Sequence, residues 1–465
     1  MLAAGATAYL ALLGGAVFAG ATSGAPAAAE STSSAAAPER LAAATTPSPA
    51  ATVATRPVPA APAAATRIRT CSAAAAASDS RLEQFQARVV NANTGEVLFD
   101  RGGSTPSRTA SVLKVLTAAA ALSVLGPDYR LTTTVVRGAE PGTVVLVGGG
   151  DVTLSRMPSG TDTAYDGAAH LDDLAAQVKA SWNADPATAG TPITTVVLDS
   201  SYFSGDAWQP SWNRKELYDG YMPEITALMV DGDRDNPTRN TSARSEDPVQ
   251  RAGTAFADAL GGVSTVLGTA PAGAPVLGQV HSQPVSTLVQ QTLIVSDNTI
   301  AEALARVTAI QAGAGSSFGS LQQGITSGLA AYGLDTSALR IVDGSGLSGD
   351  NAVPPSYLTA LLIQVENRVG NLGALYDGLP ISGQTGSLSY SDRFSGSSSR
   401  ADGAVHAKTG WIDDGYTLAG TIDASDGSVL TFAIYALGDV GDDAKQAIDA
   451  LAATFWDCGD NLSNS

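Results

Sequence analysis

Stretches in which apolar and polar positions alternate predict β-strands in several parts of the chain. Residues 85–90 alternate, Asn93-Thr94-Gly95 makes a turn, and the apolar residues 97–99 follow, as in a β-hairpin. Short apolar runs predict buried strands at 144–147 and 194–198. Further antiparallel strands are predicted near the C-terminal end, at 405–408, 417–423 and 429–437.

Longer segments predict helices between these strands. One helix begins near Ala110 and runs through an Ala- and Leu-rich stretch to Leu125. Residues 286–306 form two helical pieces, which Ser296-Asp297-Asn298 separates. A helix over 354–368 starts with proline, and one over 442–456 has acidic residues in its first turn.

The order of these elements predicts an α/β (α+β) fold that carries an insertion. A strand hairpin and helices come first, strands and a final helix come last, and a β-rich stretch lies between them. We therefore expect one catalytic body built from 68–130 and 285–465, with a second domain, 131–284, inserted into it.

The N-terminal segment indicates export. Residues 1–29 contain no charged side chain, have an apolar centre at 9–13, and end on Ala27-Ala28-Ala29, which resembles a cleavage site. Residues 30–67 are rich in Ala and Pro and show no helical or strand period, so they predict a disordered tether. The first segment is expected to be a signal peptide or a retained membrane anchor, with the folded body in the cell envelope or secreted.

Composition excludes several classes of function. The 465 residues carry 26 Lys and Arg against 44 Asp and Glu, a net charge of −18, which is unfavourable for binding nucleic acid. With three histidines and no CxxC or HExxH motif, the chain is predicted to need no metal or other cofactor. Cys71 and Cys458 lie near the two ends of the folded region, so an exported protein would join them in a disulfide; the alternative is two unpaired thiols.

Lysine is rare in this chain, and one of the five lysines lies in an S-x-x-K motif. Ser111 and Lys114 are three residues apart at the start of a predicted helix, which puts them on one face. A serine hydroxyl needs a base to become a nucleophile, and a lysine serves as that base only if its pKa falls from about 10.4 to about 7 or 8. The alternative is an ordinary capped helix with a surface lysine.

Two other short motifs carry groups suited to the same chemistry. In Ser296-Asp297-Asn298 the hydroxyl could relay a proton and the amide could hold a lysine and a substrate amide, although 299–302 also fits a helix capping box. In Lys408-Thr409-Gly410, at the end of a predicted strand, a cation could hold a carboxylate and glycine would let a peptide approach. The alternative for Lys408-Thr409-Gly410 is an ordinary strand followed by a turn, without a functional role.

The order S-x-x-K, S-D-N, K-T-G is the signature of penicillin-interacting serine enzymes. The chain resembles the D-alanyl-D-alanine carboxypeptidase/endopeptidase family of class C penicillin-binding proteins from about residue 87 to 455. The likeness extends to four flanking blocks: 147–154, 199–203, 343–348 and 379–383. It implies a penicillin-binding, serine β-lactamase-like transpeptidase fold, with an antiparallel sheet flanked by helices and a β-rich inserted domain.

The resemblance also implies roles for individual residues. Ser111 would attack the peptide carbonyl with Lys114 as base, and Ser296 would pass a proton to the leaving amine. The N–H groups of Ser111 and Trp411 would form the oxyanion hole. The remaining substrate-binding residues that the resemblance implies are Asn298, Lys408, Thr409, Gly410, Trp411, Leu347, Tyr221 and Glu216.

The implied partners are peptidoglycan stem peptides and β-lactams. The implied activity is that of a serine D-Ala-D-Ala carboxypeptidase, with endopeptidase activity on cross-links as a second activity of the same site. Trp411 stands where the family often has Thr, and Gly349 stands where some relatives carry a basic residue, so substrate preference can differ. The alternatives are a β-lactamase of the same fold and a non-catalytic wall-binding protein that retains it.

Overall fold

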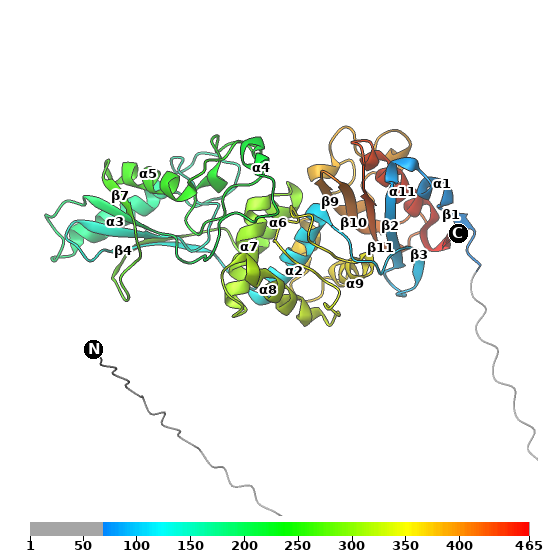
Figure 1. Cartoon of the computed structure of the whole chain (residues 1–465), viewed down its shortest axis with the longest axis horizontal. Coiled ribbons are helices and arrows are strands. Elements are labelled where there is room, and N and C mark those ends of the chain that lie inside the picture. Colours follow the sequence, from blue (N-terminus) through cyan, green and yellow to red (C-terminus); the bar gives the residue numbers. More distant parts are fainter. Residues whose placement is uncertain (1–67, 465) are drawn as a thin grey trace, which may run out of the picture. The chain divides into compact units, whose positions relative to one another are not determined.

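The structure is a computed structural model that describes residues 68–464. In it an antiparallel sheet lies next to the C-terminal helix (Figure 1). Its strands β11 (Val429–Leu437), β10 (Gly415–Asp423) and β9 (Val405–Ile412) pair in that order. The hairpin of β2 (Gln84–Asn91) and β3 (Val97–Arg101) continues the sheet beyond β11, where the N–H of Ala92 donates to the carbonyl of Val429 at 2.8 Å.

Helices cover both faces of this sheet, which explains why β10 and β11 are buried at almost every position. Because side chains alternate along a strand, Phe432 and Ile434 share one core with α11 (Ala444–Cys458). Ala433 and Tyr435 join the other core, which contains α9 (Pro355–Glu366).

A group of helices packs in the second of these cores. Its centre is α2 (Lys114–Val124), in which every residue from Lys114 to Leu122 is buried. The many alanines of α2 leave room for neighbouring helices to approach closely. The helices of this group besides α2 and α9 are α6 (Val285–Ile294), α7 (Asn298–Gln311), α8 (Leu321–Leu329) and α10 (Gly373–Asp377).

A second sheet lies between α2 and α6 in the sequence and has a hydrophobic core of its own. Its strand order is β7-β6-β5-β4-β8; β5, β6 and β7 are parallel, and β4 is antiparallel to both neighbours. The strands are β4 (Thr132–Arg137), β5 (Thr143–Val147), β6 (Thr195–Asp199), β7 (Ser264–Leu267) and β8 (Val276–His281). The helices of this region are α3 (Leu171–Ala184), α4 (Lys215–Asp219) and α5 (Pro248–Leu260), and α3 and α5 pack on the sheet. The sheet falls inside the predicted insertion, whose exact boundaries stay a prediction.

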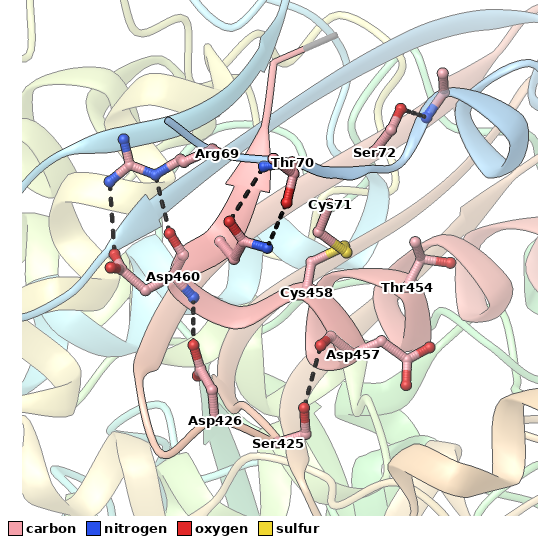
Figure 2. Close-up of a disulfide and its surroundings, with 12 residues drawn as sticks. Arg69, Thr70, Cys71, Ser72, Ser425, Asp426, Thr454, Asp457, Cys458 and Asp460 are labelled. Atoms are coloured by element: carbon pink, nitrogen blue, oxygen red, sulfur yellow. Dashed lines mark hydrogen bonds and ion pairs between the residues drawn. A yellow bond between two sulfur atoms is a disulfide. The ribbon is translucent and has the colours of Figure 1, made fainter. Parts of the chain in front are cut away.

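The two ends of the described chain meet, as the element order predicts. Cys71 and Cys458 form a disulfide, which confirms the expected pairing. Beside it β1 (Cys71–Ser72) pairs in parallel with β12 (Leu462–Ser463), and Arg69 Nε donates to the carbonyl of Asp460 at 2.9 Å (Figure 2). The short α1 (Ala74–Ala77) follows β1 and packs near α11.

Three details of the sequence-based expectations were wrong. The C-terminal helix α11 starts at Ala444, so the acidic residues 442 and 443 precede its first turn. Strand β9 does not end at the K-T-G motif but runs on to Ile412, because β10 pairs with it as far as Gly415. The cap of α7 is Asp297, whose Oδ1 accepts the N–H of Ile300 at 2.8 Å, so the alternative of a capping box at 299–302 is wrong.

The predicted export segment, 1–29, and the predicted tether, 30–67, lie outside the described residues. Within residues 68–464, none of the helices combines the length and the apolar character that crossing a bilayer requires.

Candidate active site

The S-x-x-K serine lies in a 3₁₀ turn, Ala110–Leu113, that leads directly into α2. The residue before it, Ala110, has a φ of +46°, a conformation that non-glycine residues rarely adopt. The preceding carbonyl, of Thr109, accepts a hydrogen bond of 2.6 Å from Thr417 Oγ1 on β10. The sheet therefore holds the turn that carries Ser111.

The S-x-x-K lysine is completely buried, not a surface residue. Lys114 Nζ lies 2.8 Å from Ser111 Oγ, 2.6 Å from Asn298 Oδ1 and 2.8 Å from the carbonyl oxygen of Ser345. Burial lowers the pKa of Lys114 to about 8, although the carboxylates of Asp343, Glu302 and Asp297 act in the opposite direction. A large fraction of this amine can thus be neutral near pH 8 and able to accept a proton.

The S-D-N motif forms the turn between α6 and α7. Ser296 has a φ of +59°, and its Oγ accepts a hydrogen bond of 2.9 Å from Lys408 Nζ. Asn298 accepts from Lys114 and donates through Nδ2 to the carbonyl of Tyr221 at 3.1 Å. The turn thus places the Ser296 hydroxyl beside Lys408 and the Asn298 amide beside Lys114.

The K-T-G motif brings a second buried lysine to the same place. Lys408 is fully buried, and its Nζ also donates to the carbonyl of Thr409 at 2.7 Å. Burial, with added repulsion from Lys114 and Arg393, lowers the pKa of Lys408 well below its usual value. Gly410 lets β9 pass close to the serine turn, because a Cβ there would lie only 2.7 Å from the carbonyl oxygen of Thr109.

These motifs surround a cleft of about 600 Å³. The predicted residues that line it are Ser111, Glu216, Tyr221, Ser296, Asn298, Leu347, Thr409, Gly410 and Trp411. Lys114 and Lys408 lie buried behind its wall. The structure thus brings all the predicted residues together, although they come from the distant regions 111–114, 216–221, 296–298, 347 and 408–411. Their roles stay a prediction.

Glu302 supports the site from behind, a role that sequence reasoning missed. This fully buried carboxylate accepts the N–H of Ser345 at 2.7 Å and that of Gly344 at 3.0 Å. It therefore orients the loop whose Ser345 carbonyl accepts from Lys114. Burial, and the neighbouring Asp343, raise the pKa of Glu302 to about 8. An acidic residue among the apolar residues at the start of the predicted helix was the available signal, but a capping box at 299–302 explained it equally well.

The same loop passes close to the serine turn at Gly346. This residue has a φ of +83°, and a Cβ on it would overlap the carbonyl oxygen of Ala110. The side chain of Asp343 holds the loop in shape by accepting the N–H of Gly346 at 2.8 Å and that of Ser348 at 2.6 Å. The block 343–348 thus contacts both Lys114 and Ala110, the residue that precedes Ser111.

Between residues 68 and 464, no group of three or more His, Cys, Asp or Glu side chains is arranged to bind a metal ion. The groups around Ser111 include further hydroxyls, two buried amines and an amide. Such a set suits covalent catalysis by a serine with a lysine base.

Comparison with known proteins gives matches over most of the chain. The D-Ala-D-Ala carboxypeptidase 3 (S13) family matches residues 70–240 and 233–455. Carboxypeptidase DacB of Mycolicibacterium smegmatis is 40% identical over 398 residues, 83% of each chain. A carboxypeptidase of Mycobacterium tuberculosis is 36% identical over 395 residues, 84% of each chain. This chain also matches the crystal structure of penicillin binding protein 4 from Haemophilus influenzae, with a TM-score of 0.66 and 21% sequence identity. The match covers 83% of this chain and 97% of that protein. It confirms the predicted fold class.

Proposed function

The chain belongs to the D-Ala-D-Ala carboxypeptidase 3 (S13) family of serine peptidases, and we propose that it removes the terminal D-alanine of peptidoglycan stem peptides through an acyl-enzyme on Ser111. The observation that carries the proposal is the distance of 2.8 Å between Ser111 Oγ and the Nζ of Lys114, a lysine whose burial favours its neutral form.

Acylation begins when neutral Lys114 takes the proton of Ser111. The serine oxygen forms a bond to the carbonyl carbon of the penultimate residue, and the oxyanion is stabilised by the backbone N–H groups of Ser111 and Trp411. The C–N bond then breaks, and the departing D-alanine amine receives a proton through Ser296. The contact of 2.9 Å between Ser296 Oγ and Lys408 supports this relay.

The terminal carboxylate of the substrate binds beside Lys408 and Thr409. A negative charge there raises the pKa of Lys408, so this lysine is a cation in the substrate complex more than in the empty cleft. The positive charge on Lys408 acts to lower the pKa of Lys114, whereas the negative charge of the bound carboxylate acts to raise it.

Water completes the cycle by attacking the ester carbonyl, and Ser111 recovers its proton as the shortened peptide leaves. A β-lactam acylates Ser111 by the same route, but the opened ring stays attached to the acyl group, so no leaving group departs. Hydrolysis of that ester is slow, and the result is inhibition.

A fluorescent penicillin tests the proposal. We expect wild-type protein to be labelled covalently and to release D-alanine from a pentapeptide, and the Ser111→Ala variant to do neither while it remains folded. Folded wild-type protein that fails to label would instead indicate a non-catalytic wall-binding protein. Fast, sustained hydrolysis of nitrocefin would indicate a β-lactamase. Defined muropeptides, monomeric and cross-linked, separate carboxypeptidase from endopeptidase activity.

A peptidase of the cell wall acts outside the cytoplasm, and the uncharged segment 1–29 supports export of this one. The Ala- and Pro-rich stretch 30–67 would then hold the peptidase domain away from a membrane if segment 1–29 is retained. Mass spectrometry of the N-terminus of the exported protein distinguishes a cleaved signal peptide from a retained anchor.

A further inference from the structure

A second hydroxyl lies against the K-T-G threonine on the wall of the cleft. Ser387 Oγ is 2.7 Å from Thr409 Oγ1, and both residues line the cleft. Ser387 belongs to none of the three motifs and is 22 residues from Thr409 in the sequence. The pairing is therefore made by the fold, not by a local motif.

The turn that carries Ser387 is held in place from several sides. It is a 3₁₀ turn, Gly386–Leu388, whose Leu388 is fully buried and accepts the N–H of Gly383 at 3.0 Å. Gly386 has a φ of +55°, and a Cβ on it would lie 2.5 Å from the carbonyl oxygen of Ile294, at the end of α6. The turn is thus packed beside the S-D-N loop, and Ser387, only 9% exposed, has little freedom to move.

The cations that line the cleft are poorly placed to replace these hydroxyls. Arg393 is bound through two hydrogen bonds, of 2.6 and 2.9 Å, to Asp449, and Lys445 is 2.6 Å from Asp392. Arg244 donates to two backbone carbonyls. A carboxylate has two oxygens and accepts up to four hydrogen bonds, so it needs donors besides Lys408.

We propose that Ser387 and Thr409 together form the recognition site for the free carboxylate at the end of the substrate, with Ser387 as a specificity-determining residue. The inference rests on the proposed function. Two hydroxyls in contact have two protons; when one oxygen accepts from the other, a proton remains that points outward. An anion in the cleft turns both protons toward itself, and each bond to a charged acceptor is stronger than a neutral one. The low pKa of Lys408 in the empty cleft makes these neutral donors more important for the first encounter.

Two substrates that differ only at their C-terminus test this inference. One is a D-Ala-D-Ala peptide with a free carboxylate, and the other is the same peptide as its carboxamide. For Ser387→Ala we expect kcat/KM on the carboxylate to fall roughly 10- to 100-fold, and kcat/KM on the carboxamide to change less than about 2-fold. Ser387→Thr keeps the hydroxyl and should restore most of the preference for the carboxylate.

A matched control separates recognition from support of the turn. Ser389 is exposed, and its Oγ donates to the carbonyl of Gly386 at 2.8 Å, within the same turn but away from Thr409. Ser389→Ala should retain the wild-type preference. An equal loss on both substrates in Ser387→Ala, or no loss on either, overturns the inference. Activity that survives in Ser111→Ala would instead overturn the proposed function.

Discussion

Arg234 Nη2 lies 2.7 Å from Asp297 Oδ2, and both side chains are almost wholly buried. Arg234 comes from the region between β6 and β7, whereas Asp297 is the middle residue of the S-D-N turn. The ring of Tyr165 lies 4.4 Å from the Arg234 guanidinium, and its hydroxyl donates to Asp297 at 3.3 Å. This ion pair ties the segment predicted as an insertion to the turn that carries Ser296 and Asn298.

Removal of Arg234 should therefore disturb the site as well as the fold. In Arg234→Met the carboxylate of Asp297 is left buried without its charged partner, which costs roughly 3–5 kcal/mol of unfolding free energy. We expect urea denaturation to show this loss, and the rate of penicillin acylation of the remaining folded protein to fall. The exposed residue Arg239 provides the control: Arg239→Met should leave both measurements unchanged.

A change at Asp297, the other member of the ion pair, should recover part of the stability that Arg234→Met loses. Burial would raise the pKa of Asp297, but Arg234, the N–H of Ile300 and Arg244 together hold it below its usual value. Asn at this position keeps the cap of α7 and carries no charge. The double variant Arg234→Met/Asp297→Asn should thus be more stable than Arg234→Met alone, and a double variant that is less stable would contradict the ion-pair interpretation.

The acylation rate should depend on the protonation of Lys114. Only the neutral amine accepts the Ser111 proton, so the rate should rise with pH through an apparent pKa near 8. Stopped-flow measurements with a fluorescent penicillin between pH 6 and 10 give this profile. Lys114→Met should fold but fail to acylate at any pH; acylation by this variant would exclude Lys114 as the base.

Glu302→Gln should move that profile. The pKa of Glu302 is itself about 8, so this residue carries its negative charge mainly above pH 8, where the charge raises the pKa of Lys114. Removal of that charge lowers the pKa of Lys114 and shifts the upper part of the pH profile to lower pH. Glutamine keeps one acceptor for the N–H groups of Gly344 and Ser345, whereas alanine keeps none. Glu302→Ala should accordingly slow acylation at every pH. A profile whose upper part stays in place, or moves to higher pH, in Glu302→Gln would show that this charge does not act on Lys114.

Gly346→Ala should abolish acylation because the new Cβ overlaps the carbonyl of Ala110, next to the nucleophile. The positive φ of Gly346 adds backbone strain to the overlap. Circular dichroism and covalent penicillin labelling would measure folding and activity separately. In the control Gly319→Ala the Cβ meets only Ser317 Oγ, at 3.6 Å, so labelling should be normal. Full labelling of Gly346→Ala would mean that the loop moves aside at little cost.

Reduction of the disulfide should lower stability without changing the active site. The bond joins residues 387 positions apart, and closing so long a loop in the unfolded chain stabilises the fold by up to roughly 5 kcal/mol. Neither cysteine lines the cleft. A Cys71→Ala/Cys458→Ala variant should therefore melt at a lower temperature and still be labelled by penicillin at 20 °C or below, about the usual range of maximum stability. An unchanged melting temperature would contradict the prediction.

Local patterns in the sequence were sufficient for many of the helices and strands and for the reactive groups. The alternation at 85–99 and the apolar runs near the C-terminus predicted the strands, since a two-residue period is visible without knowledge of the partner strand. Likewise, a spacing of three positions in a helix places two side chains on the same face, and this applies to Ser111 and Lys114. The polar stretch 206–247 had no such period, and neither α4 nor the position of Arg234 could be predicted there.

Tertiary structure alone decided how those groups behave. Whether Lys114 is a surface cation or a base depends on its burial, and burial is produced by helices and loops from distant parts of the chain. The same holds for Glu302, which supports a loop instead of a helix cap, and for Ser387, which meets Thr409 across a turn and a strand. The physical reason is that spacing along the chain determines which side chains share a face, whereas pKa values and long-range hydrogen bonds depend on which surfaces pack together and exclude water.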